Sequence, residues 1–428
     1  MEKESIVGVR AALVSVITRG GNEEEASVSL DELERLLETA GGTAVFRLTQ
    51  NKETPDVRTY LGSGKVAELA YYCARSEVSL VVFDGELTPS QLRNLEEDLG
   101  GNVEVIDRSM LILDIFALHA ASAEGKLQVE LAQLKYTAPR LIGKGAALSR
   151  LGGGIGTRGP GETKLETDRR HLQRRIRMLE EALSEVAENR RTQRVSRDRS
   201  GVFRVAIVGY TNAGKSTLLN YLTDAGVLAE NKLFATLDTT TRKCTLPGGE
   251  TVLLTDTVGF IRNLPHHLIR AFRSTLEEAV SADALLILVD ASDPEAASQI
   301  DVTEALLRDL GAGDKPTLFV FNKCDLGAAV GVSKGRENVL YISAATGQGV
   351  DLLLTRIEEI LHAGAKRVTF KIPNSKQHLL AQLYRNATVE DVEYGNDAVT
   401  VTAIVDDRTY GQLRDYDVNK AEVTDDEW

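Results

Sequence analysis

The chain has 428 residues, of which 43% are hydrophobic and 26% are charged, a composition typical of soluble globular proteins. Its length corresponds to about three domains at roughly 150 residues each. No apolar run approaches the ~18 residues of a membrane-spanning helix, and the first residues lack an export signal pattern. Cys73, Cys244 and Cys324 lie too far apart for a disulfide framework or a zinc cluster. We therefore expect a reducing, cytoplasmic location.

The net charge of −13 would repel nucleic acid if the acidic residues were spread evenly. They are not spread evenly. Residues 138–200 contain 15 basic and eight acidic side chains, whereas residues 386–428 contain 12 acidic and three basic side chains. One positive segment therefore lies inside an acidic chain.

Apolar runs alternate with helical patterns in the first 125 residues. The predicted strands are Ser5–Val16, Thr43–Leu48, Ser79–Phe83 and Val103–Ile106. The predicted helices are Leu30–Thr39, Lys65–Ser76 and Pro89–Leu99. Alternation of strand and helix is typical of α/β layers, so we expect an N-terminal α/β domain over residues 1–125.

Residues 126–197 differ in composition, and we expect a helical hairpin there. Helical patterns cover Lys126–Tyr136 and Glu166–Asn189, and eight glycines lie from Gly143 to Gly161. This order predicts two helices joined by a flexible, basic, glycine-rich loop. The polar stretch Arg190–Gly201 is predicted to be a linker. The candidate RNA contacts in or beside the loop are Lys144, Arg150, Arg158 and Lys164.

The α/β alternation resumes at Phe203. Strands are predicted at Phe203–Val208, Thr251–Leu254, Ala284–Val289, Thr317–Phe321 and Val339–Ile342, with a last helix at Val350–Leu361. We expect a doubly wound, mostly parallel sheet over residues 198–364. Strand signals at Arg367–Ile372 and Ala398–Val405, with a helix at Lys376–Leu383, predict a small C-terminal α+β domain over residues 365–428. The fold class is therefore multidomain α/β.

The segment Gly209–Thr217 reads G-Y-T-N-A-G-K-S-T and matches the phosphate-loop pattern G-x-x-x-x-G-K-[ST]. It follows a predicted strand and precedes a helix, where backbone N–H groups and the helix N-terminus can hold phosphate. Lys215 would bridge the β and γ phosphates, and Ser216 would bind Mg²⁺. The segment predicts a nucleoside triphosphate site.

A second segment, Asp256–Gly259, follows another predicted strand. Asp256 would hold Mg²⁺ through water, and the Gly259 N–H would sense the γ phosphate. In Ras-like enzymes the next residue is a glutamine that orients the attacking water. Here it is Phe260, which cannot bond to water. We therefore expect slow intrinsic hydrolysis that needs a further group, worth about 10³–10⁵ in rate in other GTPases.

Two later segments favour guanine over adenine. Asn322–Asp325 follows a predicted strand, and the Asp325 carboxylate can accept two hydrogen bonds from the guanine N1–H and amine. Adenine lacks that donor pair, and losing such a pair costs roughly 10⁴–10⁵ in discrimination. Ser343 and Ala344, after the next strand, offer a backbone N–H to the guanine O6. We therefore predict a Mg²⁺-dependent GTPase.

The segment Phe234–Thr240 lies between these motifs, where a switch must supply a hydroxyl to Mg²⁺. Thr236 and Thr240 are both candidates, and spacing does not choose between them. The predicted catalytic residues are Lys215, Thr236 and Gly259. The predicted GTP-binding residues are Gly209, Tyr210, Thr211, Asn212, Ala213, Gly214, Lys215, Ser216, Thr217, Phe234, Ala235, Thr236, Leu237, Asp238, Asp256, Thr257, Val258, Gly259, Asn322, Lys323, Cys324, Asp325, Ser343, Ala344 and Ala345.

The segment Gly152–Arg170, G-G-G-I-G-T-R-G-P-G-E-T-K-L-E-T-D-R-R, resembles the signature of the HflX family of bacterial ribosome-associated GTPases. The resemblance covers about residues 5–365. Further matching segments are Leu61–Lys65, Leu87–Ser90, Ile106–Arg108, Leu113–Phe116, Gln128–Ala132 and Phe234–Asp238.

The resemblance implies an N-terminal domain and hairpin that dock on the large (50S) ribosomal subunit, with the glycine-rich loop near its catalytic RNA. It implies a GTP-bound form that splits stalled 70S ribosomes under stress. It favours Thr236 over Thr240 as the Mg²⁺ ligand. Related GTPases use an asparagine at the position of Asn212 to hold K⁺, which makes K⁺ activation a hypothesis here.

Three functions are compatible with these features. The first is a ribosome-dependent translation GTPase, which the basic hairpin favours. The second is a signalling switch that acts on a protein partner. The third is a ribosome-assembly or RNA-remodelling factor in which the nucleotide controls RNA binding.

Overall fold

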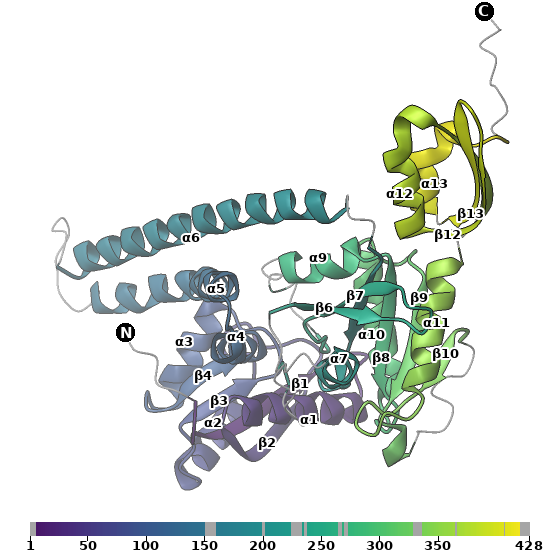
Figure 1. Cartoon of the computed structure of the whole chain (residues 1–428). Helices are drawn as coiled ribbons and strands as arrows, with labels where there is room; N and C mark the ends of the chain where they lie inside the picture. Colours follow the sequence, from purple (N-terminus) through teal and green to yellow (C-terminus); the bar gives the residue numbers. More distant parts are fainter. Residues whose placement is uncertain are drawn as a thin grey trace, which may run out of the picture.

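The computed structural model describes residues 6–149, 160–198, 202–223, 233–234, 238–263, 268, 273–327, 336–363, 366–405 and 407–419. Three sheets form within these residues, and a long helical hairpin joins the first sheet to the second (Figure 1). The predicted multidomain α/β class, with a phosphate-loop sheet between an N-terminal α/β unit and a small C-terminal unit, is confirmed.

The N-terminal unit is a parallel sheet with strand order β2-β1-β3-β4. The predicted alternation is confirmed, but the first helix begins at Glu23 rather than at Leu30, because Asn22 caps it. Asn22 Oδ1 accepts a hydrogen bond of 2.6 Å from Glu25 N. The elements are β1 (Arg10–Ile17), α1 (Glu23–Thr39), β2 (Thr43–Asn51), α2 (Ser63–Arg75), β3 (Leu80–Phe83), α3 (Pro89–Asp98), β4 (Glu104–Asp107) and α4 (Arg108–His119).

Helices cover both faces of this sheet, since successive residues of β1 enter different cores. Ala11 and Leu13 pack with α1 and α4, whereas Ala12 and Val14 pack with α2 and α3. The helix α4 was missed because its apolar side chains surround the whole helix and give little periodicity, as expected of a helix buried on all sides. Its core is continuous with that of the nucleotide-binding unit.

The predicted hairpin is confirmed: α5 (Ala123–Ser149) and α6 (Pro160–Asp198) pack against each other (Figure 1). Two predicted boundaries are wrong. α5 continues through the first two glycines of the expected loop to Ser149, because an isolated glycine costs a helix only ~1 kcal/mol. α6 continues to Asp198, so most of the expected linker is helical, which its Arg and Gln content favours.

The nucleotide-binding unit is a six-stranded sheet in the order β10-β9-β8-β5-β7-β6, parallel except for the β6–β7 pair. α7 and α11 cover one face, and α9 and α10 cover the other. The polar edge strand β6 was not predicted. The elements are β5 (Arg204–Gly209), α7 (Lys215–Thr223), β6 (Thr240–Thr245), β7 (Thr251–Asp256), α9 (Arg273–Ser281), β8 (Ala284–Asp290), α10 (Ala296–Asp309), β9 (Thr317–Asn322), β10 (Val339–Tyr341) and α11 (Val350–His362).

The C-terminal unit is an antiparallel sheet in the order β11-β13-β12 with its own apolar core. The predicted strands and helix are confirmed, but β12 was missed because a register shift between Val389 and Asp391 breaks the two-residue alternation. The short α13 was also missed. The elements are β11 (Lys366–Pro373), α12 (Gln377–Asn386), β12 (Thr388–Tyr394), β13 (Ala398–Val405) and α13 (Asp407–Leu413).

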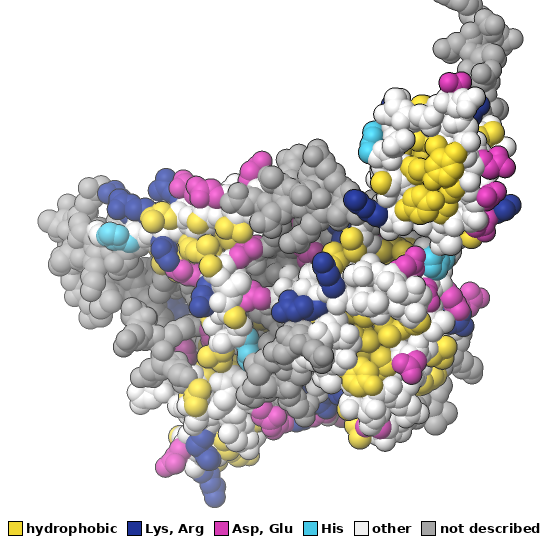
Figure 2. All heavy atoms as spheres, in the orientation of Figure 1, with side chains coloured by type: hydrophobic (Ala, Val, Ile, Leu, Met, Phe, Trp, Pro, Cys, Tyr) yellow, Lys and Arg dark blue, Asp and Glu magenta, His cyan; other side chains and the backbone are white. Residues whose placement is uncertain are grey.

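Within the described ranges, none of the helices combines the length and apolar character that crossing a membrane requires. Figure 2 shows acidic and basic side chains interspersed over the visible face, with hydrophobic atoms gathered on the C-terminal unit. Exposed large hydrophobic side chains of that unit include Tyr384, Tyr394 and Val418.

A buried carboxylate fastens the hairpin to the N-terminal sheet. Asp107, at the end of β4, is fully buried. Its oxygens accept hydrogen bonds from Tyr136 Oη at 2.5 Å, from Arg140 at 2.7 Å and from the N–H groups of Leu87 and Met110. Both Tyr136 and Arg140 belong to α5, so this one charge fixes where the hairpin leaves the sheet.

We predict that Asp107→Ala lowers the free energy of unfolding of the N-terminal unit by about 3–5 kcal/mol, because it leaves Arg140 without its buried partner. Asp98→Ala is the control, since Asp98 pairs with the exposed Arg58 at 2.6 Å and should cost less than ~1 kcal/mol. Urea unfolding followed by circular dichroism measures both. Equal losses in the two variants would contradict the assigned role of Asp107.

Candidate nucleotide-binding site

The phosphate loop joins the end of β5 to the start of α7. Gly209 has a φ of 146°, and a Cβ there would lie 2.1 Å from the carbonyl oxygen of Leu288. Gly214 has a φ of 95°, and a Cβ there would lie 2.3 Å from Asn322 Nδ2. Both positions therefore require glycine. The strand, the turn and the helix are arranged as the sequence motif predicts.

Lys215 lies in the first turn of α7 and is 6% exposed. Its Nζ donates hydrogen bonds to the carbonyl oxygens of Tyr210 at 2.9 Å and Gly209 at 3.3 Å. Burial lowers the pKa of Lys215 to about 8, and the negative charge of Asp256 partly offsets this effect. The charged form of Lys215 is therefore unfavourable in this buried site unless an anion such as phosphate binds beside it.

A hydroxyl and a carboxylate lie side by side at the same end of the sheet. Ser216 Oγ donates to Asp256 Oδ2 at 2.6 Å, and Asp256 is fully buried. Oxygen ligands from one hydroxyl and one carboxylate fit Mg²⁺, which prefers few protein ligands and several waters. Thr236, the third expected participant, lies outside the described residues.

Asn322 links the phosphate loop to the segment after β10, which is expected to contact the guanine base. It is buried, its Nδ2 donates to the Ala213 carbonyl at 2.8 Å, and its Oδ1 accepts from Ala344 N at 2.8 Å. Lys323 has a φ of 63° and pairs with Asp290 at 2.7 Å. Asp325 is exposed, so its carboxylate is open to a ligand. The Ala344 N–H, which we expected to donate to the guanine O6, is instead engaged by Asn322.

The segment of residues 256–263, which we expect to be the second switch segment, runs beside the phosphate loop. Phe260 N donates to the Gly209 carbonyl at 3.1 Å, and Thr211 N donates to the Phe260 carbonyl at 2.8 Å. A Cβ on Gly259 would lie 2.9 Å from Lys215 Nζ, so only glycine allows this approach. The Phe260 ring is buried in the core, with 1% of the residue exposed.

Four family models match consecutive parts of the chain. They are GTP-binding GTPase N-terminal at residues 27–117, GTP-binding GTPase Middle Region at 119–197, 50S ribosome-binding GTPase at 204–323 and HflX C-terminal domain at 328–421. The GTPase HflX of Lacrimispora saccharolytica is 50% identical over 409 residues, which are 95% of this chain and 96% of that protein.

The chain belongs to the HflX family. The GTPases HflX of Caldanaerobacter subterraneus and Escherichia coli are 48% and 41% identical over 95% and 90% of this chain, and these matches cover 93% and 90% of the relatives. The resemblance seen in the sequence is confirmed, and the protein is an enzyme that hydrolyses GTP. The geometry of its phosphate loop and of the segments after β7, β9 and β10 is that of the nucleotide site of such an enzyme.

The segment of residues 234–241, which we expect to be the first switch segment, contacts the N-terminal unit on both sides of Thr236. The rings of Phe234 and Phe116 meet edge to face with centroids 4.6 Å apart. Asp238 was predicted to bind GTP, but its carboxylate accepts hydrogen bonds from Ala121 N at 3.0 Å, from Ser122 N at 2.7 Å and from the Ser122 hydroxyl. This contact could not be found from the motif, since Asp238 and Ser122 are 116 residues apart. Ala235 and Leu237 lie outside the described residues.

Sequence reasoning also missed the side chains that the N-terminal unit places beside the phosphate loop. The Tyr210 hydroxyl donates to the Glu32 carboxylate and accepts a hydrogen bond from Arg262 N at 2.5 Å. Arg108 pairs with Glu32 and with Asp84, the latter at 2.8 Å. Burial, followed by the charge of Glu32, raises the pKa of Tyr210 well above its ordinary value.

Of the predicted RNA contacts, Lys144 is in α5 and Lys164 is in α6, though their side chains lie outside the described residues, as do Arg150 and Arg158 altogether. Another hairpin residue, Arg175, pairs with Glu130 at 2.7 Å and thereby holds the two helices together.

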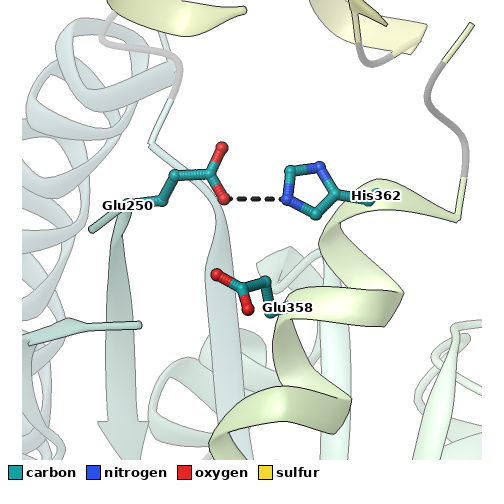
Figure 3. Close-up of side chains that lie close together, drawn as sticks. All are labelled: Glu250, Glu358 and His362. Carbon is teal, nitrogen blue, oxygen red and sulfur yellow. Dashed lines mark ion pairs between the residues drawn. The ribbon is translucent and has the colours of Figure 1, made fainter. Parts of the chain in front are cut away.

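Glu250, Glu358 and His362 form a polar cluster beside the nucleotide-binding sheet (Figure 3). His362 pairs with Glu250 at 2.9 Å, and Glu358 Oε1 accepts a hydrogen bond of 2.7 Å from Gly248 N. These contacts fasten the turn between β6 and β7 to α11, and we interpret the cluster as structural.

The pKa of Lys215 predicts how nucleotide affinity depends on pH. Phosphate favours the charged ammonium, so binding above pH 8 requires proton uptake, and GDP affinity should fall by up to about tenfold per pH unit there. Below pH 8 Lys215 is already charged and contributes no slope. Titration with a fluorescent GDP analogue between pH 7 and pH 9 measures this. A wild-type affinity that stays flat to pH 9 would contradict the prediction.

Lys215→Arg provides the control, because a guanidinium stays charged over this range and should remove the slope. Calorimetry in two buffers of different ionisation enthalpy gives a second readout. We expect proton uptake on binding at pH 9 and none at pH 7.

Proposed function

We propose that this HflX-family GTPase binds the 50S ribosomal subunit in its GTP-bound form and splits or rescues stalled 70S ribosomes in the cytoplasm under stress. The match of residues 204–323 to the 50S ribosome-binding GTPase model supports the ribosome as partner. The observation that carries the proposal is the direct contact of Asp238 in the first switch segment with the start of α5, the helix that leads to the basic loop.

The nucleotide would lie at the carboxyl ends of the sheet strands. The loop amides of residues 209–217 and Lys215 would hold the phosphates, and Asp325 would select guanine. Ser216, Asp256 through water, and Thr236 would hold Mg²⁺, which neutralises charge on the phosphates when bound. Gly259 N would donate to the γ phosphate. Catalysis is then mostly positioning and charge stabilisation. K⁺ activation through Asn212 stays a prediction, and Asn212 is exposed with a φ of 61°.

Asp238 provides the route from nucleotide to hairpin. A helix N-terminus carries unpaired N–H groups and a partial positive charge, which a carboxylate stabilises. The Ser122 hydroxyl accepts a hydrogen bond of 2.8 Å from Gly125 N in the first turn of α5, and the Asp238 carboxylate, two residues beyond Thr236, holds Ser122 in turn. If the γ phosphate and Mg²⁺ draw Thr236 toward Ser216, the same movement alters the bonds of Asp238 to Ala121 and Ser122 at the start of α5. The hairpin position then depends on whether GTP or GDP is bound.

Sedimentation through sucrose gradients with ribosomes tests the proposal. With a non-hydrolysable GTP analogue, the protein should migrate with 50S subunits and the 70S peak should fall, whereas GDP should give neither effect. Comigration in no nucleotide state would contradict ribosome binding and favour a signalling switch. Comigration with 50S precursors but not mature subunits would favour an assembly factor.

The basic loop should supply the RNA contacts. Replacing Arg150, Arg158 and Lys164 together by Ala should abolish comigration with 50S and leave GTP affinity unchanged, because these residues belong to none of the nucleotide motifs. The triple variant of Arg35, Arg75 and Arg385 removes the same charge from exposed positions elsewhere and is the control. Unchanged ribosome binding in the loop variant would refute the role of the loop.

Asp238→Ala should uncouple the nucleotide from the hairpin. Losing the acceptor of the hydrogen bonds from Ala121 and Ser122 costs about 1 kcal/mol, so the ratio of 50S affinities with GTP analogue and with GDP should fall roughly fivefold. GDP affinity alone should stay within about twofold, since the carboxylate bonds to α5. A variant that keeps the full affinity ratio would show that the hairpin senses GTP by another route.

A further inference from the structure

We propose that the Tyr210 hydroxyl, held by Glu32 and flanked by Arg108, positions the second switch segment for GTP hydrolysis. The N-terminal unit would thereby take part in the reaction without touching the nucleotide. This inference rests on the GTPase activity and does not depend on the ribosome as partner.

The bonds form a closed set around Arg262. Its N–H donates to the Tyr210 hydroxyl at 2.5 Å, and its carbonyl accepts a bond of 3.3 Å from Arg108. The Tyr210 hydroxyl in turn donates to one oxygen of Glu32, whose other oxygen pairs with Arg108. Arg108 belongs to the N-terminal unit, and Tyr210 is held by Glu32 of that unit. Both the N–H and the carbonyl of Arg262 are therefore bonded to side chains whose position depends on the N-terminal unit.

Burial makes each of these hydrogen bonds costly to lose. Tyr210, Glu32 and Arg108 are 6%, 8% and 2% exposed, so no bulk water replaces a lost partner. Arg108 lies between the carboxylates of Glu32 and Asp84, which fixes its guanidinium. The raised pKa of Tyr210 keeps its hydroxyl protonated, so it donates to Glu32 while accepting from Arg262 N. Breaking one bond leaves a buried group unsatisfied.

Hydrolysis depends on this segment because the Gly259 N–H is expected to donate to the γ phosphate, so the position of the backbone around Gly259 sets that contact. That backbone is tied to the phosphate loop by the two main-chain bonds of Phe260 and, two residues further, by the Tyr210 hydroxyl. Of these three bonds, the last is made by a side chain, and its position is set from outside the nucleotide-binding sheet. It is therefore the bond that a movement of the N-terminal unit would alter.

Another buried pair offers a matched comparison. Tyr136 Oη donates to Asp107 at 2.5 Å, so it also joins a tyrosine to a buried carboxylate. Burial likewise raises the pKa of Tyr136. This pair lies between α5 and the N-terminal sheet and does not involve the switch segments. A purely structural role for Tyr210 predicts that the two tyrosines respond alike.

The experiment compares Tyr210→Phe with Tyr136→Phe in the full chain. Tyr210→Phe should lower kcat for GTP about tenfold, because misplacing a reacting group by a fraction of an ångström is costly. Its GDP affinity should stay within about twofold, since the phosphate loop and guanine contacts are intact. Tyr136→Phe should leave kcat unchanged within about twofold. Urea unfolding shows whether the two variants lose comparable stability.

Three results would overturn the proposal. They are an unchanged or increased kcat in Tyr210→Phe, an equal loss of kcat in both variants, and a loss of GDP affinity as large as the loss of kcat, which would indicate a distorted phosphate loop. Glu32→Gln gives a graded test. Its amide oxygen can still accept from Tyr210, so kcat should lie between those of the wild type and Tyr210→Phe. A kcat below that of Tyr210→Phe would contradict the proposal that Glu32 acts on the switch segment through Tyr210.

Discussion

The arrangement of the molecule depends on where α4 can be buried. Its apolar side chains point in all directions, and the N-terminal sheet covers only one side of it. α1 and α5 also pack against it, and the Phe116 ring of α4 meets the Phe234 ring from the nucleotide-binding unit, so one apolar core runs through both units. Burial of apolar surface, at about 25 cal/mol per Å², holds the units together without specifying their orientation.

Polar bonds across this junction specify the orientation. Arg108, at the start of α4, donates to the Arg262 carbonyl at 3.3 Å, and Glu32 of α1 accepts from the Tyr210 hydroxyl, so sliding the units past each other would leave buried polar groups unsatisfied. Asp238 needs the N–H groups at the start of α5 in the same way. Since both segments take part, the contacts that fix the two units also touch the residues that we propose respond to the γ phosphate.

Short-range signals predicted most of the fold. The phosphate loop was recognised because its glycines are dictated by local geometry, as the positive φ of Gly214 shows. The failures have local causes too, such as the register shift in β12 and the uniform apolar surface of α4. The positions of the nucleotide segments were predictable because each follows a strand of one parallel sheet, and parallel strands present their carboxyl ends at one edge.

Contacts between units could not be predicted in this way. Glu32 lies on an amphipathic helix, where a charged residue ordinarily faces solvent, and its partner Tyr210 is 178 residues away. Tyr210 occupies a variable position of the phosphate-loop pattern, so the motif assigns its side chain no role. Asp238 was predicted to bind GTP because the residues next to it in sequence are expected to bind GTP. In each case the backbone position followed from the motif, but the side chain's partner depends on the packing of distant segments.

The junction has a thermodynamic consequence for a GTPase that acts on a large partner. If GTP shifts the hairpin through Asp238, then a partner that fixes the hairpin must change GTP affinity by the same factor, because coupling between binding sites is reciprocal. A coupling of 1–3 kcal/mol, typical of allosteric proteins, is within reach of the few hydrogen bonds at Asp238 and Arg262, each worth about 1 kcal/mol. Reciprocity does not extend to kcat. A partner that moves the N-terminal unit could therefore alter hydrolysis through Tyr210 independently of its effect on binding, since the two switch segments are held by separate sets of bonds.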